Sequence, residues 1–276
     1  MIHIVSDSTA VFSPEFLRAH SNVHVVPLSI CYDGEYRPEP EVTVEQVIEY
    51  TEREQENLAT SQPSTGDWLK VFSEIPAEDE IICVALTPSV SSTFSGAQLA
   101  ARQSGREKIA AVNSRTTAIG MVQLISDGLE WIDQGLSYET VLNKMQETAF
   151  KMRTCFTIDS LDYLRRGGRI GRAAGLIGSI LKIKPIIYLN PSDEVDALDK
   201  VRTHKKAIAV MMDFLHKNSP AKRIGIVHIM NEEGGRDLQA MVQAEYPDID
   251  VTLTTANSVL AAYLGPGLVG IIFEKA

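Results

Sequence analysis

Short apolar runs alternate with helical patterns along the first half of this chain, and that alternation restricts the fold more than any other feature. The runs at residues 2–5, 81–86 and 109–112 have the length and composition of buried strands. Helical patterns follow the second and third runs, at about residues 93–103 and 117–134. Strands that alternate with helices form βαβ units. The sequence therefore predicts an α/β fold whose mostly parallel sheet is covered by helices on both faces.

Between these runs the sequence gives further local signals. Thr43 and Gln46 have the spacing of a capping box, which predicts a helix that reaches about residue 57. The apolar stretch 23–30 predicts one more strand, and residues 68–72 predict another helix. The hydroxyl-rich segment 60–64 is expected to form a loop between these two helices.

The second half of the chain predicts another α/β unit. No long linker rich in proline, glycine or serine separates the halves, so we expect two closely packed domains, residues 1–153 and 154–276. This second unit starts near residues 154–158, and its strands are predicted at residues 185–189, 195–201, 224–229, 251–255 and 269–273. Its helices are predicted at residues 205–217, 235–245 and 258–263.

Charge and cysteine content narrow the class of protein. The formal net charge of −10 argues against nucleic-acid binding, which needs an excess of Lys and Arg to hold phosphates. Cys31, Cys83 and Cys155 lie far apart and form no Cys-x-x-Cys pair, which is typical of free thiols in a reducing compartment. The chain opens without a signal-peptide pattern and has no apolar run near the ~20 residues of a membrane span. We therefore expect a cytoplasmic protein.

Two hydroxyl-rich segments are the first candidates for a site. Residues 60–64 read TSQPS, and residues 91–96 read SSTFSG shortly after the predicted strand 81–86. Ligands of open α/β sheets bind beyond the carboxyl ends of strands, and residues 6–9 and 87–95 fall there. Ser and Thr are also common helix caps and turn formers. From the residues alone, a ligand-binding role and a structural role as caps and turn formers are about equally supported.

A cluster of arginines is the second candidate. Residues 163–171 read YLRRGGRIG, and with Arg172 they place four arginines close together in an acidic protein. Glycines let backbone N–H groups approach a phosphate or carboxylate, so the cluster could hold an anion or a partner. Gly167 and Gly168 could instead form the C-cap of an exposed helix. Function is favoured for Arg169, and Arg165, Arg166 and Arg172 stay open.

These segments resemble the signature segments of the DegV family of bacterial fatty-acid-binding proteins. The strand end VSDST at residues 5–9 is similar to the family's opening motif, and TSQPS and SSTFSG resemble its two hydroxyl segments. Residues 163–171, continuing through Gly178 to residues 184–186, resemble its glycine-rich signature, and residues 265–267 resemble its C-terminal Gly-Pro-Gly. The segments occur in family order over nearly the whole chain.

The resemblance implies a function and a set of site residues. Family members bury a long-chain fatty acid between their domains and serve a separate ATP-binding fatty acid kinase. Its positions for the carboxylate map to Thr60 and Ser92, and a docking position for the kinase maps to Arg202. The resemblance implies no metal or cofactor besides the lipid and allows transient contact with a membrane surface. The expected ligand-binding residues are Thr60, Ser61, Ser91, Ser92, Ser95, Gly96, Arg169 and Tyr263.

One position departs from the family pattern. The family usually has a histidine two residues before Gly-Pro-Gly, where this chain has Tyr263. A tyrosine hydroxyl can donate a hydrogen bond but supplies no positive charge. The head-group contact, or the ligand itself, is therefore expected to differ from the family norm, unless Tyr263 serves only for packing.

Two other functions stay open. One is an enzyme acting alone on an acyl or phosphate ester with Ser92 or Ser95 as nucleophile, although no histidine lies near them in sequence. The other is a regulatory protein whose domains shift when lipid binds. The glycines at 265–270 spell G-x-G-x-x-G without the strand and helix of a dinucleotide site, and the chain has no Walker-type loop, G-x-S-x-G elbow or His-Glu-x-x-His motif.

Overall fold

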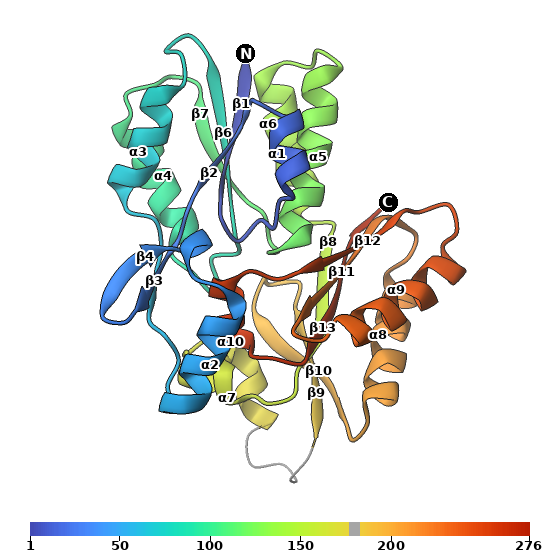
Figure 1. The fold of residues 1–276 in the computed structure, drawn as a ribbon. Coiled ribbons are helices and arrows are strands. Elements are labelled where there is room, and N and C mark those ends of the chain that lie inside the picture. Colours follow the sequence, from blue (N-terminus) through green and yellow to red (C-terminus); the bar gives the residue numbers. More distant parts are fainter. Residues whose placement is uncertain (177–182) are drawn as a thin grey trace.

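The computed structural model describes residues 1–176 and 183–276 and confirms the predicted α/β fold class. Its upper part in Figure 1 is a four-stranded sheet in the order β2-β1-β6-β7, with each neighbouring pair parallel. The strands are β1 (Ile2–Asp7), β2 (Val23–Val26), β6 (Glu80–Ala85) and β7 (Ile109–Asn113).

Helices cover both faces of this sheet, as predicted (Figure 1). Along β1, successive side chains point to opposite faces. Ile4 belongs to the core on the side of α5 and α6, and Val5 packs with Trp68 and Phe72 on the side of α3 and α4. The helices are α1 (Pro14–Ala19), α3 (Thr65–Glu74), α4 (Thr93–Gln103), α5 (Ile119–Asp133) and α6 (Tyr138–Ala149).

The second sheet is mixed and has six strands in the order β10-β9-β8-β13-β11-β12. Its neighbouring strands are antiparallel except for β11 and β12, which are parallel. Helices α8 (His204–Asn218) and α9 (Glu232–Glu245) cover one face. The strands are β8 (Met152–Thr157), β9 (Lys184–Leu189), β10 (Val195–Val201), β11 (Ala221–Ile229), β12 (Val251–Thr255) and β13 (Leu268–Lys275).

The opposite face of the second sheet turns toward the first sheet. Helix α5 contacts both β11 and β13 there. The short helix α10 (Ser258–Leu264) precedes β13 in the chain. Asp127 of α5 is fully buried and accepts hydrogen bonds from Lys222 Nζ at 2.5 Å and Arg223 Nε at 2.8 Å. Helix α5 therefore belongs to the packing of both sheets.

The prediction of one strand over residues 23–30 was wrong. The stretch divides into β2 in the first sheet and β3 (Ser29–Tyr32) in a separate antiparallel sheet with β4 (Glu35–Pro38) and β5 (Thr60–Ser61). Pro27 stands between them and has no N–H to continue the ladder. The segment 60–64, expected to be a loop throughout, begins with the two residues of β5.

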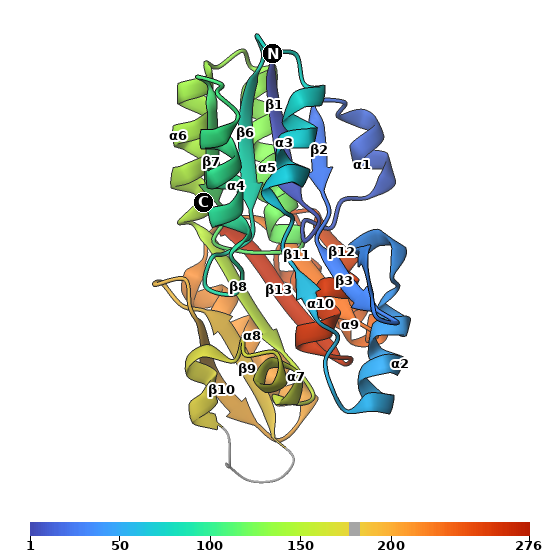
Figure 2. The same ribbon diagram turned by 90° about the vertical axis from the view of Figure 1, so that its left-hand side faces the viewer.

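The chain between β4 and β5 packs against α10, more than 200 residues later in the sequence. It contains η1 (Glu39–Glu41) and α2 (Val44–Glu54), and the capping box of Thr43 and Gln46 at the start of α2 is confirmed. Helix α7 (Asp162–Arg166) contacts α10 as well, on the side away from α2 in Figure 2. Helix α10 therefore packs against η1, α2 and α7.

Some elements had no clear signal in the sequence, namely α6, α7, the β3-β4-β5 sheet and the short helix η2 (Gly171–Leu176). The predicted boundary between residues 153 and 154 falls within β8 and stays a prediction. Gly178, part of the predicted glycine-rich signature, lies outside the described residues.

Candidate ligand-binding site

A cavity of about 360 Å³ lies where the two sheets meet. Its walls come from the loops after β6 and β7, from β5, from the inner face of the second sheet, and from α7 and α10. It falls beyond the carboxyl ends of parallel strands β6 and β7, where ligands of such sheets bind.

The body of the cavity is apolar. Phe156, Leu189 and Val195 line it from the second sheet, and Leu260 and Leu264 line it from α10. A second, much smaller void of about 30 Å³ shares Phe156, Leu260 and Leu264 with it and is lined almost wholly by apolar atoms. An alkyl chain placed here would leave water for hydrocarbon surroundings.

The loop after β6 is held in place by a buried carboxylate. Asp7, at the end of β1, accepts hydrogen bonds from the backbone N–H of Leu86 at 2.8 Å and of Thr9 at 2.8 Å. Burial raises the pKa of Asp7 to about 6, although these hydrogen bonds act to lower it. Asp7 is not among the described residues that line the cavity. It instead positions the loop whose residues Leu86, Thr87 and Val90 form part of the wall.

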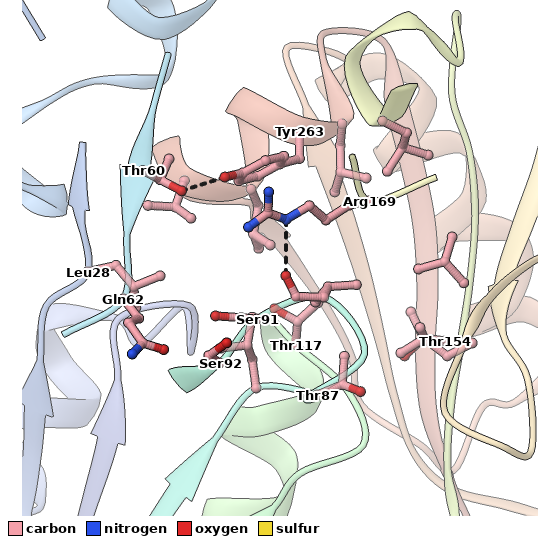
Figure 3. A pocket seen from close by; sticks show the side chains of 18 of the residues that line it. Leu28, Thr60, Gln62, Thr87, Ser91, Ser92, Thr117, Thr154, Arg169 and Tyr263 are labelled. Atoms are coloured by element: carbon pink, nitrogen blue, oxygen red, sulfur yellow. Dashed lines mark hydrogen bonds between the residues drawn. The ribbon is translucent and has the colours of Figure 1, made fainter. Parts of the chain in front are cut away.

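Thr60 and Tyr263 meet at the polar end of the cavity, although 203 residues separate them. Their hydroxyl oxygens are 2.6 Å apart, and Figure 3 shows the pair above Ser91 and Ser92. Thr60 is carried by β5, where it pairs with Ile30 of β3. Tyr263 lies on the last turn of α10.

The N-terminus of α10 is anchored to η1 by a buried acid. Ser258 donates a hydrogen bond from Oγ to Glu39 Oε1 at 2.9 Å, and Asn257 caps the helix by accepting the N–H of Leu260 at 3.0 Å. Burial is the largest cause of the raised pKa of Glu39. This network fixes the helix that presents Tyr263.

Arg169 brings the positive charge of the site (Figure 3). Its guanidinium carbon lies 4.6 Å from the centre of the Tyr263 ring, a cation–π geometry. It donates hydrogen bonds from Nη1 to the Gly167 carbonyl at 2.7 Å and from Nε to the Val90 carbonyl at 3.2 Å. Within residues 1–176 and 183–276, no carboxylate oxygen lies within 4 Å of this guanidinium, so its charge is available to an anion.

The other arginines of the cluster are engaged elsewhere. Arg165 pairs with Asp162 at 3.3 Å and Arg172 with Glu194 at 2.8 Å. Arg166 donates a hydrogen bond to the side chain of Gln55 at 3.2 Å. Of the four, Arg169 is the one that lines the cavity.

The serines that precede α4 differ in what they do. Ser91 Oγ accepts the backbone N–H of Thr93 at 3.3 Å and lies 2.8 Å from the Thr93 hydroxyl, so it is engaged in the turn. Ser92 occupies the N-cap position, but its hydroxyl makes no capping hydrogen bond to any residue that the structure describes. Ser92 lines the cavity with its hydroxyl available.

Of the residues predicted to bind ligand, the cavity wall brings together Thr60, Ser61, Ser91, Ser92, Arg169 and Tyr263. Its described lining does not include Ser95, which is exposed on α4, or Gly96, which is buried beneath the Gln62 amide at ordinary contact distance. Arg202 is exposed between β10 and α8, outside this wall. The part that each of these residues takes in binding stays a prediction.

Sequence reasoning missed several residues of the wall. Gln62, Thr87, Thr117 and Thr154 contribute polar atoms, and most of the apolar lining lies outside the quoted motifs. Gln62 and Thr87 could have been found because they stand inside or beside the hydroxyl segments. Thr154 lies on a strand 37 residues after Thr117, and nothing in the local sequence links the two.

The described part of the chain contains no group of three or more His, Cys, Asp or Glu side chains that could hold a metal ion. Among the described helices, none is long and apolar enough to cross a membrane. All three cysteines are free.

Comparison with known proteins gives a consistent result. The whole chain, residues 1–276, matches the model of a family described as uncharacterised proteins of the DegV family. Protein DegV of Bacillus subtilis is 29% identical over 276 residues, which cover 98% of each chain.

Two solved structures illustrate the structural likeness. A DegV family protein from Thermus thermophilus, described as binding fatty acid, superposes with a TM-score of 0.92 at 26% identity and covers 100% of this chain and 99% of its own. The Fatty Acid Kinase (Fak) B3 protein of Streptococcus pneumoniae, loaded with linoleic acid, has a TM-score of 0.87 at 22% identity, with all of both chains covered. At that identity the second structure establishes a common fold.

Proposed function

The chain belongs to the DegV family, and on this premise we propose that it binds one long-chain fatty acid in the cavity between its two sheets. The tail would lie against Phe156, Leu189, Leu260 and their apolar neighbours. The carboxylate would lie at the polar end, beside Arg169, Thr60 and Ser92.

The observation that supports this proposal most is the contrast within one cavity. An apolar body ends at a guanidinium that has no carboxylate partner among the described residues, flanked by hydroxyls with free hydrogen-bonding capacity. A fatty acid has the same division into a hydrocarbon chain and an anionic head. The T. thermophilus relative, described as a fatty-acid-binding protein, supports the same ligand class.

The tail and the head group of a fatty acid would contribute different amounts to the binding free energy. Burying an alkyl chain contributes ~0.8 kcal/mol per methylene, or on the order of 10 kcal/mol for a long chain before the costs of binding. A hydrogen bond to a charged head group contributes about 1.5–3 kcal/mol. The tail therefore supplies most of the affinity, and the polar end sets the register and selects the head group.

We also propose that the bound carboxylate is presented to a separate ATP-dependent kinase, which would form an acyl phosphate. Ser61 and Ser92 are exposed at the polar end, so a partner could reach the head group. The exposed Arg202 is a candidate for docking that partner. The fold shared with a fatty acid kinase B protein supports this role, which would belong in the cytoplasm with transient contact at membrane surfaces.

Native mass spectrometry tests the binding proposal. Protein purified from a bacterial host is measured before and after solvent extraction, and the extracted protein is incubated with palmitic, oleic or hexanoic acid. We expect a single fatty acid adduct with palmitic or oleic acid and none with hexanoic acid at equal concentration, because the short chain buries too little surface. Protein that stays free of every long-chain acid would refute the proposal.

The same preparation separates binding from catalysis. Extracted protein is incubated with p-nitrophenyl palmitate and p-nitrophenyl phosphate. Turnover that disappears in Ser92→Ala would identify a serine-dependent enzyme and replace the carrier function. A regulatory sensor would be favoured by a different pair of results. Small-angle scattering would show domain movement on lipid binding, and a kinase would form no acyl phosphate from the bound fatty acid.

A further inference from the structure

The hydroxyl pair of Thr60 and Tyr263 has one proton more than its mutual hydrogen bond uses. At 2.6 Å one hydroxyl donates to the other, and either could be the donor. In the described part of the chain this is the one hydrogen bond that either hydroxyl makes. The proton that remains belongs to whichever hydroxyl accepts, and it is free to point into the cavity.

We propose that Tyr263 donates to Thr60 and thereby leaves the Thr60 hydroxyl to donate to the anionic head of the ligand. The proposal rests on the fatty acid function above and assigns Tyr263 a positioning role within it. The resulting chain runs from Tyr263 Oη–H to Thr60 Oγ1, and from Thr60 Oγ1–H to a carboxylate or acyl phosphate oxygen.

Two observations favour this direction over the reverse. A phenol is a stronger hydrogen-bond donor than an aliphatic hydroxyl, so the shared proton belongs on Tyr263. The Arg169 guanidinium lies 4.6 Å from the ring centre and withdraws electron density from it, which strengthens the phenol as a donor.

The packing around Tyr263 holds its ring in the position that this chain requires. Gly167 lies under the ring, where a Cβ would come within 2.7 Å of Cε1. Arg169 covers the ring face, and α10 is fixed at its other end by Glu39 and Ser258. The tyrosine therefore presents its hydroxyl to Thr60 with little freedom to turn elsewhere.

The arrangement selects a class of head group. A donor that is fixed in direction favours heads that can only accept, such as a carboxylate or an acyl phosphate, and is of no use to a head that must donate, such as an alkyl ammonium. The positive charge of Arg169 likewise favours an anionic head group. Tyr263 thus contributes to head-group recognition through Thr60 rather than by touching the ligand.

A double-mutant cycle on the affinity for palmitic acid tests the proposal. The proteins are wild type, Tyr263→Phe, Thr60→Val and the double variant, each lipid-extracted and titrated by calorimetry. Phenylalanine keeps the ring under Arg169, and valine keeps the shape of threonine. Both single variants should therefore fold, and thermal melting is used to check this.

We expect Tyr263→Phe to weaken binding about three- to tenfold in wild type. In the Thr60→Val background the same change should leave the affinity unaltered, because the hydroxyl through which Tyr263 acts is gone. An equal loss in both backgrounds would mean direct contact with the ligand, and no loss in wild type would mean a packing role. Either result overturns the proposal and leaves the fatty acid function standing, whereas a wild-type protein that does not bind palmitic acid overturns both.

Discussion

Gly167 lies so close to the ring of Tyr263 that the site has no room for a Cβ at position 167. An added Cβ would come within 2.7 Å of Tyr263 Cε1 and within 3.2 Å of Asn57 Nδ2. The φ of Gly167 is −75°, which any residue adopts, so the requirement for glycine here is one of space. The C-cap residue that follows α7 therefore determines where a ring on α10 can lie.

Replacing Gly167 with alanine is expected to push Tyr263 away from Thr60. We expect a loss of stability of about 1–3 kcal/mol from overpacking and a weaker affinity for fatty acid. Urea unfolding and palmitic acid titration measure the two effects. Gly175→Ala is the matched control, because no described atom lies within 4 Å of a Cβ there. Equal behaviour of the two variants would contradict the steric argument.

Arg169→Gln is expected to weaken fatty acid binding about 10- to 100-fold, because a charged hydrogen bond to a partly buried carboxylate contributes about 1.5–3 kcal/mol. Arg165→Gln serves as the control, since Arg165 is exposed and paired with Asp162 outside the cavity wall. Calorimetric titration with palmitic acid compares them. A head group that binds elsewhere would give both variants the affinity of wild type.

Stability should depend on pH through Asp7. Burial raises its pKa to about 6 in the folded protein, above the value of about 4 in an unfolded chain. The folded state thus holds the proton more tightly. The contribution of Asp7 to the free energy of unfolding is therefore fully present below about pH 4 and is lost as the pH rises through 6. The shift of about two units corresponds to about 3 kcal/mol.

Asp7→Asn removes this titration while keeping the size of the side chain. Urea unfolding of both proteins between pH 4 and 7 should show wild type losing up to about 3 kcal/mol relative to the variant as the pH rises. The variant's absolute stability does not enter the comparison. A difference that stays constant with pH would show that Asp7 does not titrate in this range.

The three thiols should react unequally. Cys83 and Cys155 are fully buried, and burial raises the pKa of both thiols, so neither offers a reactive thiolate. Cys31 is partly accessible on β3. Iodoacetamide in native buffer should add one label, located at Cys31 by peptide mass mapping, and three labels in guanidinium. Native labelling of Cys83 would contradict the burial.

Local pattern predicted much of the fold because each signal had a local cause. Thr43 and Gln46 formed the expected capping box, and the apolar run at residues 81–86 became a buried strand. The prediction of one strand over residues 23–30 was wrong because the apolar run continues past Pro27, whereas the hydrogen bonds between strands are interrupted there. Helix α7 was not found because five residues are too few to show a helical period.

The candidate site was predictable where its residues stand in recognisable segments. Thr60, Ser92 and Arg169 stand in such segments and line one cavity, and their part in binding stays a prediction. The hydrogen bond between Thr60 and Tyr263 was out of reach, because it depends on how β5 and α10 pack across 203 residues of sequence. Ser64 illustrates the opposite outcome. It belongs to the hydroxyl segment but caps α3 in a box with Asp67.

Helix α5 packs against both sheets. Its Asp127 is neutralised by Lys222 and Arg223 of β11, and β11 approaches the helix so closely that a Cβ at Gly225 would come within 2.7 Å of Ile119. A chain cut near residue 153 would leave one half with an unpaired carboxylate on an exposed apolar helix. The halves should therefore melt in a single calorimetric transition, and neither should fold when expressed without the other.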